Sequence, residues 1–391
     1  MTGTQKQSVD PPLAGVRVLD LADERGIYGS KLLADLGAST IRLESSHEDG
    51  LRQRGPFNKD GESLWYSYYA SNRVVIEIDT ESDHGITQLK KLVSKADIII
   101  DTGIVNSITS TEFNLNDLNS KVVHVDVSSF GQNGPWKDFL APDLIAGALG
   151  GSVATTGDID TTPIKLFGDQ SFLVSGTYAA IAALTGLYDS YETGLGDRID
   201  IPVHETIAST LEHVLMFALY PGLFPWADGK VLPRRGSLHW GNAYEVVPAI
   251  GGSIMVTPTP NAEKQIAWLV EEQVEEDLLD ERYMALEHRQ EFVKRIMTVL
   301  RKWVATKDAE SFFHEAQRRH YPFGLVMKPN EVANNPHLQE RNWWKEYPTE
   351  NSVVKGPGDP YKFSRSVLNK PTEQITFTSL SKNILNTIGW V

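Results

Sequence analysis

Short apolar runs alternate with amphipathic segments over the N-terminal part of the chain. The sequence predicts strands at 16–21, 39–44, 74–78, 97–101 and 122–127, and helices at 29–37 and 83–94. Strands that alternate with helices are typical of a parallel sheet with helices on both faces. The pattern therefore predicts an α/β fold with a doubly wound sheet.

The pattern changes in the middle of the chain. Segments 176–191 and 204–219 are apolar on most faces, which predicts two buried helices. Beyond them the sequence predicts two paired strands and three helices, at 244–247, 253–256, 262–272, 291–304 and 309–318. Pro and Gly concentrate in two stretches that indicate linkers. We expect a large domain at 12–220 and 337–391, linkers at 221–236 and 321–336, and a small domain at 237–320.

Composition limits the classes of function. The chain has 391 residues and a formal net charge of -14, which argues against nucleic acid or an anionic membrane as a partner. A local cationic pocket can still bind an anionic small molecule. Cysteine is absent, which excludes disulfides and thiolate chemistry. The first residues lack the apolar core of a signal peptide, and no apolar run reaches the ~18 residues of a membrane span. We expect a cytoplasmic protein.

Few motifs carry chemistry by themselves. The sequence has no Walker A loop or GxGxxG fingerprint, and its ten histidines show no HExxH spacing, so we expect no metal. The loop after the first strand contains Gly26 and Gly29, which either line a ligand at the strand end or belong to an ordinary βα loop. Arg25, Arg234 and Arg235 either hold phosphates or are solvated surface residues.

Several longer segments of the sequence resemble conserved segments of a known enzyme family. They are PLAGVRVLDL at 12–21, LADLGASTIRLE at 33–44, SNRVVIEID at 71–79, SSFGQNGPWKD at 128–138, APDLIAGALGG at 141–151, TGLGDRIDIPVHE at 193–205 and ANNPHLQERNWW at 333–344. In this order they resemble the family III CoA-transferases, the group that includes formyl-CoA transferase, carnitine CoA-transferase and alpha-methylacyl-CoA racemase.

The resemblance implies a fold and an activity. It implies a Rossmann-like large domain built from both chain ends, a smaller α+β domain, and two chains that interlock as a dimer. It also implies coenzyme A thioesters and an organic acid as substrates, with no tightly bound cofactor. In this family an aspartate attacks the donor acyl-CoA, and an aspartyl-CoA thioester then passes CoA to the acceptor acid.

The position of that aspartate holds Phe172 in this sequence. Phe172 lies four residues before the helix-opening Gly176 and 22 residues before Gly194 of the Thr-Gly-x-Gly turn, as the resemblance requires. A benzyl side chain has no lone pair with which to attack a thioester. The nearest carboxylate is Asp169, three residues upstream, which is the alternative nucleophile.

Other positions that the resemblance assigns to CoA binding also differ. Asn72 and Arg73 match an Asn-Lys pair of the family, with arginine for lysine. Arg25, with Gly26 and Ile27, stands where the family usually carries Ala-Gly-Pro, and Thr102 stands at the position of an asparagine. We name Asn72, Arg73 and Arg25 as candidate cofactor-binding residues.

Three hypotheses for the function follow. The first is a catalytically silent subunit of a heteromeric CoA-transferase whose partner is a related, aspartate-bearing chain. The arrangement is similar to that of benzylsuccinate CoA-transferase, which pairs two related chains of which one lacks the aspartate. The comparison suggests succinyl-CoA as the CoA donor. The second is a self-sufficient homodimer that uses Asp169. The third is a non-enzymatic acyl-CoA binding protein.

Overall fold

The chain forms two compact units, which are described separately. The structure is a computed structural model that describes residues 10–44, 49–105, 115–158, 160–220, 244–258, 262–368, 370–372, 375–377 and 380–390. The first unit comprises residues 1–153, 165–212 and 340–391, and the second comprises 154–164 and 213–339. The predicted linker at 221–236, together with Arg234 and Arg235, lies outside the described residues. The predicted domain boundaries stay predictions.

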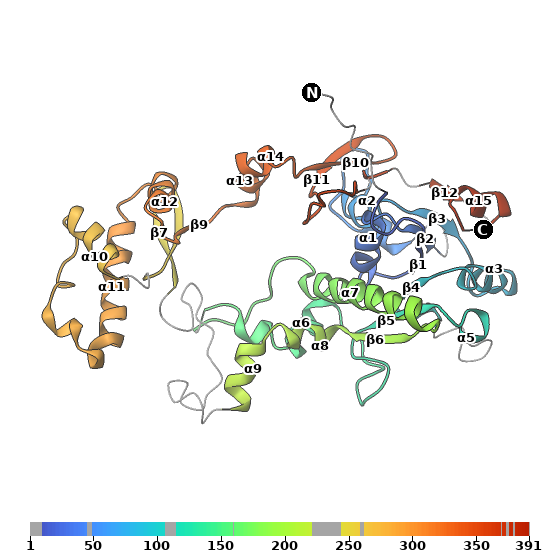
Figure 1. The fold of residues 1–391 in the computed structure, drawn as a ribbon, viewed down its shortest axis with the longest axis horizontal. Coiled ribbons are helices and arrows are strands. Elements are labelled where there is room, and N and C mark those ends of the chain that lie inside the picture. Colours follow the sequence, from blue (N-terminus) through green and yellow to red (C-terminus); the bar gives the residue numbers. More distant parts are fainter. Residues whose placement is uncertain are drawn as a thin grey trace. The chain divides into compact units, whose positions relative to one another are not determined.

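A parallel sheet of seven strands organises the first unit (Figure 1). Its strands are β1 (Arg17–Leu21), β2 (Ser39–Glu44), β3 (Val74–Glu77), β4 (Ile98–Asp101), β5 (Val123–Ser128), β6 (Arg198–Pro202) and β12 (Ile375–Phe377). The order is β12-β3-β2-β1-β4-β5-β6, so the C-terminal strand completes the sheet beside β3. Leu19 of β1 is paired with Ile41 of β2 and with Ile99 of β4. The strand order therefore reverses between β1 and β4, as in a Rossmann-like sheet.

Helices cover both faces of this sheet. They include α1 (Ile27–Asp35), α3 (Asp83–Val93), α7 (Gln170–Thr193) and α15 (Lys382–Thr387). Val18 and Val125 of the sheet belong to the core that contains residues of α1 and α7, whereas Leu19 belongs to the core with residues of α3 and α15. The central strand β4 is a nearly continuous apolar run because both of its faces are buried, whereas β6 and β12 at the edges are partly exposed. The predicted doubly wound α/β fold is confirmed.

Two glycines allow α1 and α7 to pack closely. A methyl group on Gly29 would lie 2.8 Å from the Gly176 carbonyl oxygen, and one on Gly176 would lie 2.8 Å from Cβ of Tyr28. Gly29 therefore serves helix packing. By length and composition alone, α7 is the one helix among the described residues that is apolar enough to cross a membrane. Half of that stretch is buried in the protein, and Ile181, Tyr188 and Tyr191 are exposed, so the helix predicted to be buried at 176–191 is buried on one face only.

The remaining elements surround the sheet or lie in the second unit. They are η1 (Gly50–Gln53), α2 (Leu64–Tyr69), α5 (Leu115–Leu118), α6 (Asp143–Leu149), η2 (Val153–Thr155), α8 (Val203–Ser209), α9 (Glu212–Leu219), β10 (Lys345–Pro348) and β11 (Val353–Gly356). The prediction of one buried helix over 204–219 is wrong in two respects. The helix breaks between α8 and α9, and Leu215, Met216 and Leu219 of α9 are exposed, because no described part of the chain covers that face.

The second unit is built around a small antiparallel sheet. Its elements are β7 (Glu245–Ala249), β8 (Gly252–Val256), β9 (Gly324–Leu325), α10 (Ala262–Glu271), η5 (Glu281–Met284), η6 (Leu286–His288), α11 (Arg289–Val304), α12 (Ala309–Arg318), α13 (Pro329–Ala333) and α14 (Pro336–Glu340). Strands β7 and β8 pair across Gly251, which confirms the predicted hairpin. The aromatic rings of Trp268, Trp303 and Phe312 pack together in its core.

Candidate active site

A cavity of about 460 Å³ lies at the carboxyl ends of β1, β2 and β4. Leu21, Glu44, Thr80 and Thr102 are among the residues that line it. Rossmann-like sheets bind their ligands at this edge, where the strand order reverses. The cavity is therefore the candidate ligand site of the first unit, and we call it the switch-point crevice.

The first βα loop is bonded to the end of β4 beside this crevice. Arg25 Nη2 donates a hydrogen bond of 2.8 Å to the Thr102 carbonyl oxygen, and the Asp23 amide donates one of 3.0 Å to Thr102 Oγ1. Asp23 also forms an ion pair of 2.5 Å with Arg25. Two residues that depart from the family pattern, Arg25 and Thr102, thus contact each other. Ile27, the third departure, is buried at the start of α1.

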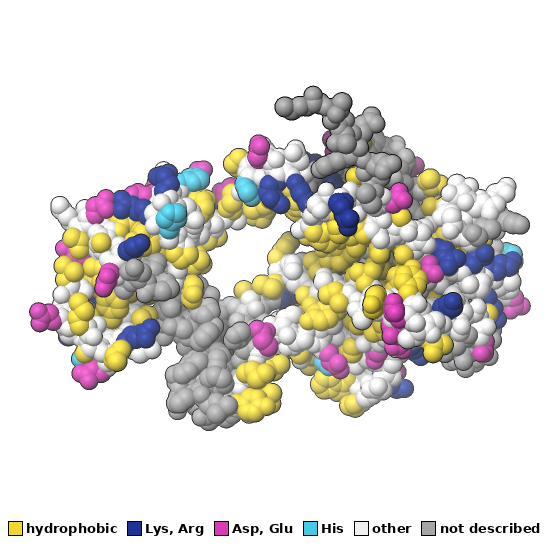
Figure 2. Space-filling view, viewed as in Figure 1, with side chains coloured by type: hydrophobic (Ala, Val, Ile, Leu, Met, Phe, Trp, Pro, Cys, Tyr) yellow, Lys and Arg dark blue, Asp and Glu magenta, His cyan; other side chains and the backbone are white. Residues whose placement is uncertain are grey.

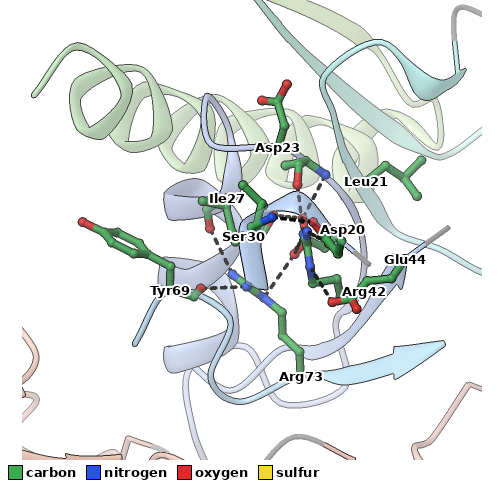
Figure 3. A network of polar contacts seen from close by, with 12 residues as sticks. Asp20, Leu21, Asp23, Ile27, Ser30, Arg42, Glu44, Tyr69 and Arg73 are labelled. Atoms are coloured by element: carbon green, nitrogen blue, oxygen red, sulfur yellow. Dashed lines mark hydrogen bonds and ion pairs between the residues drawn. The ribbon is translucent and has the colours of Figure 1, made fainter. Parts of the chain in front are cut away.

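A buried network of charged groups lies behind the crevice (Figure 3). The Asp20 carboxylate accepts hydrogen bonds from Ser30 Oγ at 2.9 Å and from the Ala22 amide at 3.1 Å. It forms ion pairs with Arg42 at 3.3 Å and with Arg73 Nε at 3.2 Å. All three charged side chains are almost inaccessible to water. A buried carboxylate between two guanidinium groups fixes β1, β2 and β3 at the same edge.

Arg42 makes further contacts that point toward the crevice. Its Nη2 forms an ion pair of 2.8 Å with Asp49, and its Nε lies 3.3 Å from Glu44. Burial alone would lower the pKa of Arg42, but Asp20 and the other acidic groups around it raise this pKa above its ordinary value. Arg42 is therefore a permanent cation whose charge the protein already neutralises.

The candidate residues Asn72 and Arg73 lie away from the cavity lining. Asn72 has a left-handed backbone, with φ of 62°. Its Nδ2 donates to Asp35 at 2.8 Å, and its Oδ1 accepts from the Thr372 amide at 3.0 Å. Arg73 donates to the carbonyl oxygens of Tyr69 and of Ile27 as well as pairing with Asp20. A role for Asn72 and Arg73 in CoA binding stays a prediction.

Phe172 lies in the first turn of α7 and is 4% exposed. Its ring belongs to the core on the α1–α7 face of the sheet. Asp169 immediately precedes α7, and its carboxylate forms an ion pair of 2.5 Å with Arg54. The Arg54 guanidinium lies over the ring of Trp65, 4.7 Å from its centroid. The Asp169 side chain is 30% exposed, so it reaches solvent while it is paired with a cation.

The segment 128–138 lines a second cavity of about 420 Å³ at the carboxyl end of β5. The Gln132 amide donates to Asp200 Oδ2 at 2.8 Å, which ties this loop to β6. Gly131 has φ of +89°, a conformation that glycine adopts without strain. Phe130 contacts Trp136 and His204 through its ring. The loop therefore has a defined shape next to the core that holds Phe172.

Sequence reasoning missed one buried cluster of potential metal ligands. Asp101, His124 and Asp126 each offer a ligand atom, and these atoms lie within 4.8 Å of one another. The residues come from β4 and β5, so no short sequence motif indicates that they lie together. Arg198 forms an ion pair of 2.9 Å with Asp126, and Asp101 accepts hydrogen bonds from the amides that follow β4. His124 Nε2 also lies 3.4 Å from Asp101 Oδ2, so these contacts pair a part of the polar atoms of the cluster.

Comparisons with known proteins agree with this fold and with the sequence resemblance. Residues 13–373 match the sequence profile of CoA-transferase family III. The chain is 26% identical to the succinyl-CoA:(R)-benzylsuccinate CoA-transferase subunit BbsE of Thauera aromatica, over 89% of this chain and 87% of that protein. It is 27% identical to a succinyl-CoA–D-citramalate CoA-transferase of Chloroflexus aurantiacus, over 84% and 82% of the two chains.

A solved structure shares the fold. The crystal structure of a CAIB/BAIF family protein from Brucella suis superposes with a TM-score of 0.79 at 22% identity, and the match covers 94% of this chain and 97% of that one. The profile match spans nearly the whole sequence. The chain belongs to CoA-transferase family III.

Proposed function

We propose that this chain is the catalytically silent subunit of a heteromeric acyl-CoA:carboxylate CoA-transferase. The observation that carries the proposal is Phe172, a buried benzyl side chain at the position of the family's nucleophilic aspartate. The covalent route needs an oxygen nucleophile, and a phenyl ring offers none. The fold is complete around this position, because Phe172 packs in the same core as Val125 and Ala179.

The alternative is a homodimer in which Asp169 is the nucleophile. The partial exposure of the Asp169 carboxylate favours it. Its ion pair with Arg54 argues against it, because a guanidinium at 2.5 Å withdraws the electron density that an attack on a thioester requires. The Arg54 side chain also lies over Trp65, which holds the pair in place. The silent-subunit proposal is therefore the better supported of the two.

The partner that we propose is an aspartate-bearing paralogue that interlocks with this chain as a dimer. The surface supports an extensive interface, since hydrophobic side chains gather over α7 in Figure 2. Exposed apolar residues of α6 and α7 in the first unit include Leu144, Leu149, Ile181, Tyr188 and Tyr191. An exposed apolar surface of this extent marks an interaction site in a soluble protein.

The proposed substrates are coenzyme A thioesters and organic acids, without a resident cofactor. The likeness to BbsE suggests succinyl-CoA as donor and a benzylsuccinate-type acid as acceptor. We expect the enzyme to act in the cytoplasm.

The decisive experiment compares the chain alone with the chain in complex with an aspartate-bearing paralogue. The lone chain should show no acyl-CoA exchange, and after incubation with succinyl-CoA the covalent adduct should be found by peptide mass spectrometry on the paralogue alone. Turnover by the lone chain that survives Phe172→Ala and disappears in Asp169→Asn would replace the proposal with the homodimer. Binding of acyl-CoA without turnover or a partner would support the non-enzymatic hypothesis.

A further inference from the structure

The guanidinium groups around the switch-point crevice already have anionic partners from the chain itself. Arg25 is paired with Asp23 at 2.5 Å, and Arg42 with Asp49 at 2.8 Å. Another cavity shares Asp23 and Asp49 with the crevice, and we call it the mouth of the crevice. Arg54 lines this mouth and is paired with Asp169. No described side chain that lines the crevice therefore offers an unpaired cation to a phosphate.

The charge balance points the same way. Among the described residues that line the crevice and its mouth, the carboxylates are Asp23, Glu24, Glu44 and Asp49, and the cations are Arg42 and Arg54. A nucleotide with several phosphates requires a positive local potential, because each phosphate must exchange its water for N–H donors. The crevice presents an excess of negative charge instead.

The amides at the start of α1 are also occupied. The Ile27 amide donates to the Asp23 carbonyl oxygen at 3.0 Å, and the side chain of Arg25 reaches across to the Thr102 carbonyl oxygen. Helix N-termini bind phosphate through amides that point into the site. Here the Gly26 amide also donates to the Asp23 carbonyl oxygen, at 3.2 Å, and a methyl group on Gly26 would lie 3.2 Å from Cγ2 of Thr102.

We propose that the crevice of this chain excludes coenzyme A, and that Asp49 is the specificity-determining residue. The proposal rests on the function proposed above and adds which chain holds the CoA. The Asp49 carboxylate occupies Arg42 Nη2, the donor that a phosphate oxygen in the crevice would need. In the heteromer, one CoA thioester then binds for each pair of chains, on the paralogue.

The test measures CoA binding to the purified full chain by isothermal titration calorimetry, with Asp49→Asn and a matched control. Asparagine keeps an oxygen that can accept from the Leu51 amide, as Asp49 Oδ1 does at 2.9 Å, so the cap of η1 is retained. Glu24→Gln is the control, because it removes the same charge from the mouth of the crevice without touching Arg42.

The wild-type chain should bind CoA with a Kd above about 1 mM. Asp49→Asn should tighten binding by about ten-fold or more, because it frees a charge-assisted donor, and Glu24→Gln should change it less than about three-fold. Micromolar binding by the wild-type chain, or equal gains in the two variants, would overturn the proposal. Micromolar binding without turnover would leave the silent-subunit function standing, whereas turnover by the lone chain would remove that function.

Discussion

The Arg25 guanidinium donates a hydrogen bond to the Thr102 carbonyl oxygen at 2.8 Å, although 77 residues separate the two in the sequence. The bond joins the loop after β1 to the end of β4, the two strands between which the sheet reverses its order. A loop that is bonded across this point cannot open around a ligand without losing the contact. The hydrogen bond therefore makes this loop more rigid and occupies two groups that could otherwise contact a ligand.

Arg25→Ala should lower the free energy of unfolding by about 1–2 kcal/mol, because the half-buried side chain makes hydrogen bonds with Asp23 and Thr102. Urea denaturation measures this loss. Arg282→Ala, which removes an exposed side chain that also contacts carboxylates, should leave the unfolding midpoint unchanged. Equal effects of the two substitutions would show that the bond to Thr102 carries no stability.

Gly29→Ala should destabilise the chain despite the higher helix propensity of alanine. Propensity favours alanine by about 1 kcal/mol, but the added methyl group would lie 2.8 Å from the Gly176 carbonyl oxygen and would force α1 away from α7. We expect a net loss of about 1–2 kcal/mol in urea denaturation. Gly50→Ala is the control, since no atom lies within 4 Å of the added group. A more stable Gly29→Ala variant would contradict the close packing of α1 and α7.

Strands β1 to β5 of the sheet were predictable, because buried strands such as β4 are short apolar runs, whereas β6 and β12 are exposed at several positions and were not predicted. The strand predicted at 39–44 corresponds to β2 (Ser39–Glu44). The break between α8 and α9 was not predictable from the sequence, because no glycine or proline separates Ser209 from Glu212. The exposure of α9 was missed for a similar reason, since an apolar helix face does not reveal whether its own chain covers it.

The residues of the candidate site were predictable only in part, since Thr102 lines the crevice whereas Asn72 and Arg73 do not. The resemblance placed Arg25 and Thr102 beside the ligand edge of the sheet, and the strand order brings them together. Their hydrogen bond depends on the path of a loop, which no local pattern encodes. The role of Asp49 was not predicted, because its ion pair with Arg42 is a tertiary contact that no local sequence pattern encodes.

Lys31→Met should cost about 3 kcal/mol of stability, because it leaves the buried Asp35 carboxylate without its cation. Lys31 Nζ lies 2.9 Å from Asp35 and is almost inaccessible to water. The double variant Lys31→Met with Asp35→Leu should recover much of the loss, since it removes both charges together. A double-mutant cycle in urea measures the coupling, and additive losses would show that the two charges do not interact.

Stability should fall as the pH rises above about 10, because buried phenols resist ionisation. Burial raises the pKa of Tyr69 to about 12, with a further contribution from Tyr28. Because this pKa lies above its unfolded value, the contribution of Tyr69 is complete below pH 10 and is lost as the pH rises toward 12. Burial lowers the pKa of Lys31, so the stability gained by its deprotonation is complete once the pH passes the ordinary lysine pKa of about 10.4, where the loss from the tyrosines begins. The raised pKa values of Tyr66, Tyr68 and Tyr347 add to the effect of Tyr69 and outnumber Lys31.

Urea denaturation from pH 8 to pH 11.5, with absorbance at 295 nm to follow phenol ionisation, tests this balance. The wild-type chain should lose stability above pH 10. Tyr69→Phe should lose less, because it lacks one of the phenols whose pKa is raised in the folded state. A stability that is constant over this range would show that Lys31 and the tyrosines offset each other.

Phe172→Asp should restore a carboxylate without restoring catalysis. The Phe172 side chain is buried in the core, so an aspartate there would be ionised in a nonpolar environment or would take up a proton, and a protonated carboxyl group is a poor nucleophile. We expect a loss of about 3 kcal/mol in urea denaturation and no exchange activity above that of Phe172→Ala. Phe172→Leu, which keeps an apolar side chain, should lose less. If Phe172→Asp alone gives exchange activity, together with an adduct on residue 172, then the aspartate is the only missing part of an otherwise competent site. The crevice would then have to bind CoA in spite of Asp49, so the exclusion of CoA would fail, whereas the silence of the wild-type chain, which carries Phe172, would stand.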